Sequence, residues 1–377
     1  MLGNQRDLFE IPEGIAYLNC AYMSPLPRAA REAGEAAVAR KGHPWEITLR
    51  DFFDEAETAR GLFAELVGGE PEGVAIIPSI SYGVGTAAAN ITLRQGQTIV
   101  LLEDQFPSNV YPWRDLAERT GATIVTVPRP LDFDWTGALL ERIDERTGVV
   151  AVPNCHWTDG SLVDLVRVGE RARAVGAALV VDTAQSLGAY PLNVGEVRPD
   201  FLVATTYKWL LGPYSLGFLY VAPHRRDGRP LEFNWITREG SEDFAGLADY
   251  REGYQPGARR FDMGEWANFE LMPIAIASLR QILEWRVERI AATLREMTTR
   301  IESNARKIGL DVAPSERRAG HMIGLRSSTA LPPELPARLA AAGVYVSVRG
   351  TAIRVSPHLY NTPEDIDRLF EVLGQML

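Results

Sequence analysis

Between residues 73 and 221, short apolar runs alternate with longer amphipathic stretches. The apolar runs read GVAIIPS, QTIVLLED, ATIVTVP, VVAVPN, AALVVD, DFLVATT and LGFLYV, and stretches such as SLVDLVRVGERARAVG stand between them. Strands that alternate with helices in this way build βαβ units, so the pattern predicts an α/β fold with a mainly parallel sheet covered on both faces. In such sheets ligands gather at the carboxyl ends of the strands.

The rest of the chain departs from this rhythm. Residues 223–265 mix glycine, charged residues and scattered aromatics, a composition typical of a lid or an interface. From residue 268 a long amphipathic stretch leads into a smaller α+β unit, which contains HMIGLRS, VYVSVRG, TAIRVSP and a last helix capped by Thr362. We therefore expect a large domain over residues 20–260 and a small domain over residues 261–377, with residues 1–19 packed on the small one.

Composition and charge narrow the class of ligand. The chain has 377 residues and a formal net charge of −10, which disfavours a nucleic acid or a membrane surface as partner because phosphate groups would be repelled. Two cysteines, a polar N-terminal stretch and apolar runs far shorter than the ~20 residues of a membrane span favour a cytoplasmic protein. The five histidines show no metal-ligand spacing, so we expect a small-molecule ligand and no metal site.

Two charged residues stand where strands of the predicted sheet end. Lys208 interrupts the apolar stretch ATTYKWLLGPYSLGFLYV, and Asp182 ends AALVVD. Taken singly, the lysine would extend its amine to water and the aspartate would cap a helix. Taken together, they match pyridoxal phosphate chemistry, in which an amine of lowered pKa forms a Schiff base with the cofactor aldehyde and a carboxylate keeps the pyridine nitrogen protonated.

Several motifs in order along the chain carry a family resemblance. VVDTAQSLG, ATTYKWLLGPYSLGFLYV, RFDMGEWAN and IRVSPHLYNTPEDIDRL together resemble the class V aminotransferases, which are fold type I pyridoxal-phosphate enzymes related to cysteine desulfurases, kynureninases and isopenicillin N epimerases. The resemblance extends from YLNCAYMSPLP, at residue 17, to the final helix. It implies pyridoxal 5'-phosphate as cofactor, a homodimer and a reaction at the Cα of a small amino acid or amine. Amino transfer is the preferred outcome, with a lyase or an epimerase as the alternatives.

The resemblance also implies roles for individual residues. Lys208 would hold the cofactor, Asp182 would pair with its pyridine nitrogen, and Gln185 would donate to its phenolic oxygen. Arg354 matches the arginine that grips the substrate α-carboxylate, a task suited to a planar guanidinium. The other implied cofactor-binding positions are Thr205, Ser81 and Tyr82 at the phosphate, and Phe106 and Trp157 beside the ring.

The chain departs from the family pattern in two places. VYVSVRGTAIRVS holds no cysteine where desulfurases carry their nucleophile, so we do not expect persulfide chemistry. Glu265 follows Gly264 where the family often has a threonine that reaches the phosphate of the neighbouring subunit, and a carboxylate would repel that phosphate. Four arginines in the irregular segment leave two interpretations open, selection of an acidic substrate or a solvated loop: Arg225, Arg226, Arg259 and Arg260.

A glycine pattern supports a different class of enzyme. GVGTAA, residues 83–88, fits the G-x-G-x-x-A fingerprint and would indicate a nicotinamide-dependent oxidoreductase. However, SISY separates the preceding strand from the first glycine, where the fingerprint requires a tight turn. This alternative also leaves Lys208, Asp182 and Arg354 unexplained, so the pyridoxal-phosphate interpretation is preferred.

Overall fold

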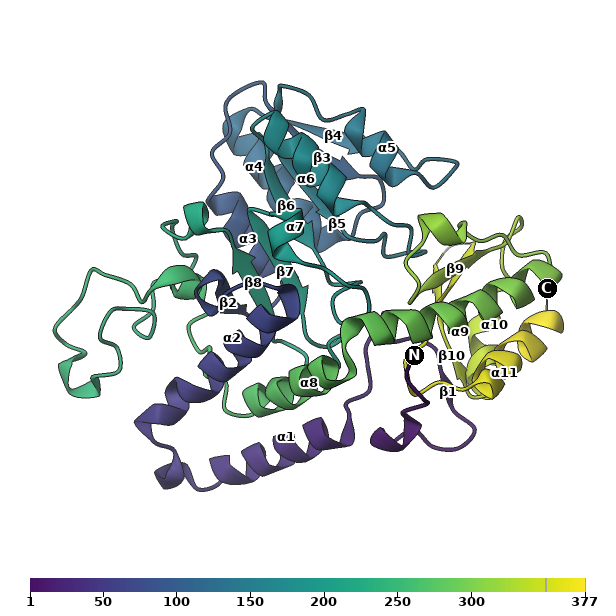
Figure 1. Ribbon diagram of the computed structural model, residues 1–377, viewed down its shortest axis with the longest axis horizontal. Helices are drawn as coiled ribbons and strands as arrows, with labels where there is room; N and C mark the ends of the chain where they lie inside the picture. The colour runs from purple at the N-terminus through teal and green to yellow at the C-terminus, as the bar shows by residue number, and fades with distance from the viewer. Residues whose placement is uncertain (350, 377) are drawn as a thin grey trace.

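Within residues 1–349 and 351–376, which this computed structural model describes, a seven-stranded sheet forms the centre of the larger unit (Figure 1). Its order is β2-β8-β7-β6-β5-β3-β4; β8 runs antiparallel to both neighbours, and the remaining pairs are parallel. The predicted α/β fold with a mainly parallel sheet is therefore confirmed.

The strands are β1 (Ala16–Tyr17), β2 (Val74–Ile77), β3 (Thr98–Leu102), β4 (Thr123–Val127), β5 (Thr147–Pro153), β6 (Ala178–Asp182), β7 (Phe201–Thr205), β8 (Gly217–Val221), β9 (Ile323–Arg326), β10 (Val344–Tyr345), β11 (Ser347–Arg349) and β12 (Ala352–Val355). The α-helices are α1 (Arg28–Lys41), α2 (Asp54–Val67), α3 (Ile80–Ala89), α4 (Tyr111–Thr120), α5 (Trp135–Leu140), α6 (Leu165–Ala174), α7 (Val194–Val197), α8 (Leu271–Trp285), α9 (Val287–Lys307), α10 (Leu335–Ala341) and α11 (Pro363–Gly374).

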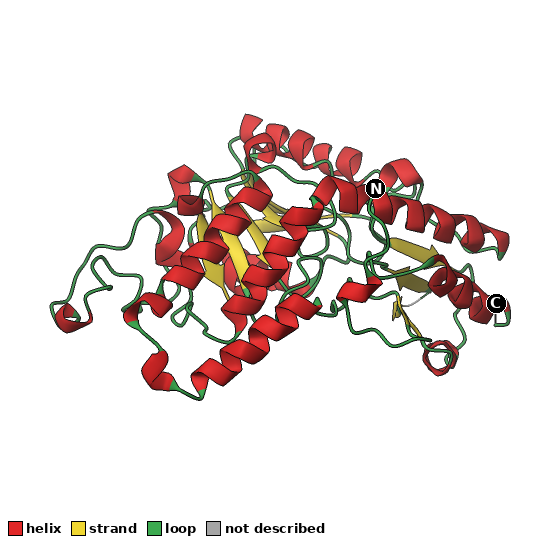
Figure 2. Ribbon diagram, turned by 60° about the horizontal axis from the view of Figure 1, so that its bottom comes forward, coloured by secondary structure: helices red, strands yellow, loops and turns green. Residues whose placement is uncertain are grey.

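Helices cover both faces of the central sheet (Figure 2). Successive residues of a strand point to opposite faces, and β6 shows the consequence: Val181 packs with side chains of α2, α6 and α8, whereas Val180 packs with those of α3 and α4. Because both faces are buried, the strands carry continuous apolar runs instead of alternating polar and apolar residues.

The smaller unit is built from the C-terminal part of the chain together with its first residues. β11, β12 and β9 form an antiparallel sheet, and β1 pairs in parallel with β10. α8 packs on α1 and α2, and its Met272 and Leu279 belong to the core beside the central sheet. This packing favours a domain boundary near Arg286, between α8 and α9, and we propose it in place of the expected boundary after residue 260.

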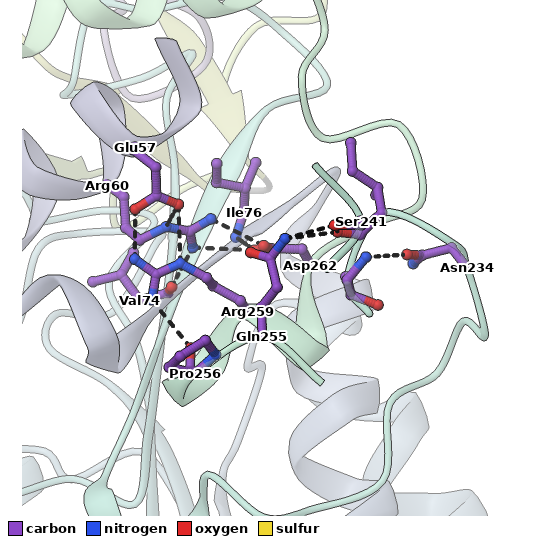
Figure 3. A network of polar contacts seen from close by, with 12 residues as sticks. Glu57, Arg60, Val74, Ile76, Asn234, Ser241, Gln255, Pro256, Arg259 and Asp262 are labelled. Atoms are coloured by element: carbon purple, nitrogen blue, oxygen red, sulfur yellow. Dashed lines mark hydrogen bonds and ion pairs between the residues drawn. The ribbon is translucent and has the colours of Figure 1, made fainter. Parts of the chain in front are cut away.

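Ion pairs fasten one end of the irregular segment to the large unit (Figure 3). Arg60 of α2 is fully buried and binds both carboxylate oxygens of Asp262, at 2.9 and 3.2 Å. Asp262 also accepts a hydrogen bond from the backbone N–H of Ile76 in β2, at 2.5 Å. Beside them Arg259 binds Glu57 of α2, at 2.5 and 3.0 Å. These contacts fix the segment around residue 260 against α2 and β2.

Among the described helices, none combines the length and apolar character that a membrane crossing requires.

Candidate active site

The carboxyl ends of β2, β3, β5, β6 and β7 lead into one cavity of about 340 Å³. Parallel strands end at the same edge of a sheet, so residues far apart in sequence meet there. The structure brings most of the predicted residues to this cavity: its lining includes Ser81, Phe106, Trp157, Asp182, Gln185, Thr205 and Lys208. Tyr82 and Arg354 are outside the lining.

Lys208 lies in the turn that follows β7. Backbone hydrogen bonds hold this turn, from Gly212 N to Thr206 O at 2.8 Å and from Leu211 N to Lys208 O at 3.1 Å. The lysine is only 6% exposed. Burial, and then repulsion from Arg354, lowers the pKa of the Lys208 amine to about 8, although Asp182 opposes the shift. The lowered pKa gives this amine a larger uncharged fraction near neutral pH than an ordinary lysine has, and the uncharged amine acts as a nucleophile and as a base.

Asp182 is the last residue of β6 and is buried. Its Oδ1 accepts a hydrogen bond from Ala184 N at 2.9 Å. Within the described part of the chain, the carboxylate has no lysine, arginine or histidine nitrogen within 4.0 Å. Burial raises the pKa of Asp182, while the Ala184 hydrogen bond and the charge of Lys208 oppose the rise. A cationic N–H beside this buried group would favour its charged form, and a protonated pyridine nitrogen is such a partner.

Gln185 is held in one orientation by Trp209, the residue after Lys208. The indole Nε1–H donates to Gln185 Oε1 at 3.2 Å, and Gln185 Nε2 donates to Ala21 O at 3.2 Å. Because an indole nitrogen is only a donor, the side-chain oxygen of Gln185 must face Trp209. The amide nitrogen therefore keeps a second hydrogen for an acceptor in the cavity.

The N-terminus of α3 supplies an anion-binding end to the cavity. Ser79 caps the helix, accepting from Tyr82 N at 3.2 Å, and its Oγ lies 2.9 Å from Ser81 Oγ. The hydroxyls of Thr205, Ser108 and Ser215 belong to residues of the same lining. Free N–H groups and the helix dipole favour a phosphate at this position.

The side chain of Tyr82 is outside the lining of the cavity. Its side chain packs between α3 and the sheet, and its backbone N–H already donates to Ser79. Ser81 lines the cavity and Tyr82 is outside the lining. The assignment of Tyr82 to the cofactor phosphate stays a prediction.

Two aromatic rings form one wall of the cavity. The centroid of the Phe106 ring lies 5.4 Å from Lys208 Nζ, and the ring is 41% exposed. Trp157 meets Phe106 edge to face at a centroid distance of 5.6 Å, and its indole donates to Asp104 O at 2.6 Å. Phe106 offers an apolar surface for a flat ring, and the hydrogen bond of Trp157 fixes the second ring beside it.

Arg354, on β12, lies behind Trp157 and is only 2% exposed. It donates to Trp157 O at 2.9 Å and to Ser347 Oγ at 3.3 Å. Its Nε is buried and has no hydrogen-bond partner among the described residues. Burial, and then the positive charge of Arg349, lowers the pKa of Arg354 to about 10. The guanidinium thus retains donor capacity for an anion beside the cavity.

The two cysteine thiols lie close to the site, but their burial makes them unreactive. Cys20 and Cys155 are both buried, and burial raises the pKa of each thiol. Cys155 lines the cavity with its Sγ 3.2 Å from Gln185 O. A neutral buried thiol is a poor nucleophile. Where the structure describes side chains, it contains no cluster of three or more His, Cys, Asp or Glu residues able to hold a metal ion.

Sequence reasoning missed other residues of the lining. Tyr207 precedes Lys208 directly, and its ring centroid lies 5.4 Å from the lysine Nζ. Its neighbour Tyr214 packs on it at 4.6 Å. The apolar pattern around Lys208 gave no reason to separate these two rings from core aromatics. Ser79 carried a usable signal, because a serine directly before a helical pattern predicts an N-cap.

The four arginines of the irregular segment are engaged with acids of this chain. Arg225 binds Asp200 at 2.7 Å, Arg226 binds Glu70 at 2.7 Å, Arg259 binds Glu57 and Arg260 binds Asp227 at 3.3 Å. Because each arginine is paired with an acid and none of the four lines the cavity, these contacts favour a structural role over selection of an acidic substrate. A solvated loop does not describe them either, since the four side chains are only 14–29% exposed.

Glu265 is the position where the chain departs from the family pattern after Gly264. There the backbone N–H of Gly264 donates to Glu232 Oε2 at 2.5 Å.

The glycines of the dinucleotide fingerprint are helical. Gly83 lies inside α3, and a Cβ added there would come within 2.6 Å of Val203 Cγ1 and 2.8 Å of Ile77 Cδ1. This glycine is needed because α3 packs closely on the sheet. The turn after β2 is made by Pro78 and Ser79, so the nicotinamide interpretation is wrong.

The fold, a buried lysine of lowered pKa, a buried carboxylate with no cationic side chain within 4.0 Å among the described residues and a helix N-terminus define this as a site for pyridoxal phosphate. The Aminotransferase class-V family matches residues 32–369, and the chain belongs to that family. The chain is 29% identical to the uncharacterized aminotransferase YcbU of Bacillus subtilis, over 92% of this chain and 89% of YcbU. It is 26% identical to the isopenicillin N epimerase of Streptomyces clavuligerus, over 96% and 95% of the two chains.

A solved structure of the cystine C–S lyase C-DES supports the fold. This C-DES variant, which has glycine covalently linked to its PLP cofactor, superposes with a TM-score of 0.89 at 18% identity. The alignment covers 99% of this chain and all of the C-DES chain. At this low identity the similarity establishes the architecture, and the cofactor assignment rests on the family and on the site residues.

Proposed function

We propose that this protein is a pyridoxal-phosphate-dependent aminotransferase for a small amino acid, working in the cytoplasm as a homodimer. The observation that carries the proposal is the pairing of Lys208 with Asp182 in one cavity, with the buried Arg354 beside it. A reactive thiol, which a desulfurase would require, is not among the described residues of the lining, since Cys155 is buried with a raised pKa. The resemblance to YcbU points the same way.

The residues present fit the cofactor at both ends. Asp182 would hold the pyridine nitrogen, Gln185 the phenolic oxygen, and the α3 N-terminus with Ser81 and Thr205 the phosphate. When bound, pyridoxal phosphate supplies a carbon that accepts the substrate amine and a ring that withdraws electrons from the substrate Cα.

The chain itself then binds the substrate and moves a proton. Arg354 holds the α-carboxylate, which fixes the orientation of Cα relative to Lys208. Lys208 Nζ removes the proton from Cα, since its lowered pKa leaves part of the amine uncharged near neutral pH. Phe106 and Trp157 provide the apolar wall of the cavity beside this position.

The proton inventory of the cavity favours amino transfer over epimerisation. Amino transfer needs one base that removes a proton and returns it elsewhere on the same side. Epimerisation needs an acid on the opposite side of Cα as well. Burial raises the pKa of Tyr207, whose ring centroid lies 5.4 Å from Lys208 Nζ, to about 12, so this phenol is a weak acid for that task. The proposal therefore gives Lys208 both proton transfers.

The visible absorption spectrum of the purified protein tests the proposal. The protein should show a yellow band after incubation with pyridoxal phosphate, and the band should bleach to pyridoxamine phosphate when a matching amino donor is added. Bleaching that fails while ammonia is released from the donor would indicate a lyase, and loss of donor chirality alone would indicate an epimerase. A protein that never forms the band would contradict the cofactor assignment.

A further inference from the structure

A second arginine stands beside Arg354 on the same face of a hairpin. β11 and β12 are antiparallel, with Ser347 opposite Arg354 and Arg349 opposite Ala352. Side chains two positions apart on a strand share a face, so Arg349 and Arg354 are diagonal neighbours across the pair. Such neighbours have Cα atoms about 7–8 Å apart, within reach of two long side chains. The hydrogen bond from Arg354 to Ser347 Oγ, at 3.3 Å, lies on this face.

The two guanidiniums carry charge that the described part of the chain does not neutralise. Neither has a carboxylate oxygen within 4.0 Å among the described residues, whereas the four arginines of the irregular segment each have one. Arg349 is the largest charge influence on Arg354 and lowers its pKa. Two neighbouring cations without an acid partner repel each other, and an anion between them would remove the repulsion.

Trp157 connects this pair with the cavity. Its carbonyl oxygen accepts from Arg354 at 2.9 Å, and its ring centroid lies 5.9 Å from Arg349 Cζ. The same ring meets Phe106, which faces Lys208. Arg349 is thus exposed and close to the ring of Trp157, whereas Arg354 is buried beside the backbone of that residue. An anion that reached both guanidiniums would border the wall of the cavity.

We propose that Arg349 is a specificity-determining residue that binds a second carboxylate, so that the substrate is a dicarboxylic amino acid of the aspartate or glutamate type. Arg354 takes the α-carboxylate and Arg349 takes the side-chain carboxylate. The inference rests on the proposed function, because it names the substrate class of the same site. An acidic substrate would then be selected by Arg349 of the β11–β12 hairpin and not by the arginines of the irregular segment.

Calorimetric titration with two unreactive ligands tests the proposal without relying on turnover. Succinate and butyrate have chains of equal length but differ in having two carboxylates or one. Each is titrated into protein incubated with pyridoxal phosphate, for the wild type, Arg349→Gln and Arg349→Lys. Arg338→Gln, on α10, is the matched control because it changes the net charge by the same amount.

The wild type should bind succinate about tenfold more tightly than butyrate. This ratio corresponds to the smallest contribution typical of a charge-assisted hydrogen bond, which we expect because Arg349 is exposed. Arg349→Gln should remove this preference, Arg349→Lys should keep part of it, and Arg338→Gln should keep all of it. In turnover assays, the ratio of kcat/KM for glutamate to kcat/KM for glutamine should fall in the same order among these variants.

Two results would overturn the inference: a wild type that binds both ligands equally, or an Arg349→Gln variant that keeps the succinate preference. The absorption spectrum of each sample separates this outcome from failure of the proposed function. Protein without a cofactor band contradicts the enzyme assignment, while its calorimetric succinate preference still decides whether Arg349 and Arg354 form a dicarboxylate site.

Discussion

Attachment of pyridoxal phosphate to Lys208 should depend on pH with a midpoint near 8. The pKa of Lys208 is lowered from 10.5 to about 8, chiefly by burial. This shift raises the uncharged fraction at pH 7 from about 0.03% to about 9%, which is roughly a 300-fold gain in reactive amine. It corresponds to about 3 kcal/mol of differential stabilisation of the uncharged form.

Two variants should move this midpoint in opposite directions. Repulsion from Arg354 lowers the pKa of Lys208, so Arg354→Gln should raise the midpoint. Attraction to Asp182 raises the pKa, so Asp182→Asn should lower the midpoint. Both side chains are buried, so solvent screens these effects only weakly.

Stopped-flow absorbance provides the assay. Protein freed of cofactor is mixed with pyridoxal phosphate across a pH series, and the initial attachment rate is normalised to its plateau. Nα-acetyl-lysine serves as the control for an ordinary amine. A midpoint near that of the control, or variants that both shift in the same direction, would refute the reasoning from burial and charge.

Four further predictions follow from individual contacts. Lys208→Met should abolish covalent attachment and turnover, and should stabilise the cofactor-free protein at pH 7 by about 2–3 kcal/mol in urea unfolding. That gain should disappear between pH 8 and 10.5, because the unfolded wild type binds the extra proton in this range and its stability therefore rises with pH. Arg60→Met leaves the buried Asp262 without its arginine partner and should lower the free energy of unfolding by about 3–5 kcal/mol. The double variant Arg60→Met/Asp262→Leu should recover a large part of this loss. Equal losses in the single and the double variant would contradict this account. Trp209→Phe removes the donor that orients Gln185, so the cofactor band should shift and turnover should fall about fivefold to tenfold, whereas an unchanged wavelength would indicate a purely structural loss. Cys155→Ser should retain turnover within about threefold, because a buried neutral thiol takes no part in the reaction, and a loss of more than tenfold would reopen a thiol-dependent mechanism.

The sequence by itself determined the sheet and the strand ends. Both faces of the parallel strands are buried, so successive residues of each strand are apolar. A continuous apolar run of this kind can be recognised from the sequence alone. The positions of Asp182 and Lys208 at strand ends follow from the same pattern. Since parallel strands end at a common edge, the pairing of these two residues in one cavity was predictable without coordinates.

Only the tertiary structure decided which neighbours the remaining side chains have. The helical rotation that turns Ser81 toward the cavity and Tyr82 away from it depends on how α3 lies on the sheet. The charges of Arg225, Arg226, Arg259 and Arg260 look available in the sequence, yet each is neutralised by an acid on another part of the fold or nearby in its own segment.

Arg349 shows the converse. Its sequence neighbours do not distinguish it from a surface arginine, and the pairing of β11 with β12 places it beside Arg354 and Trp157. Periodicity along a chain records which face of an element is buried, because burial acts on every residue of that element. The partner of a single charged side chain depends on one long-range contact, and such a contact leaves no repeating pattern in the sequence.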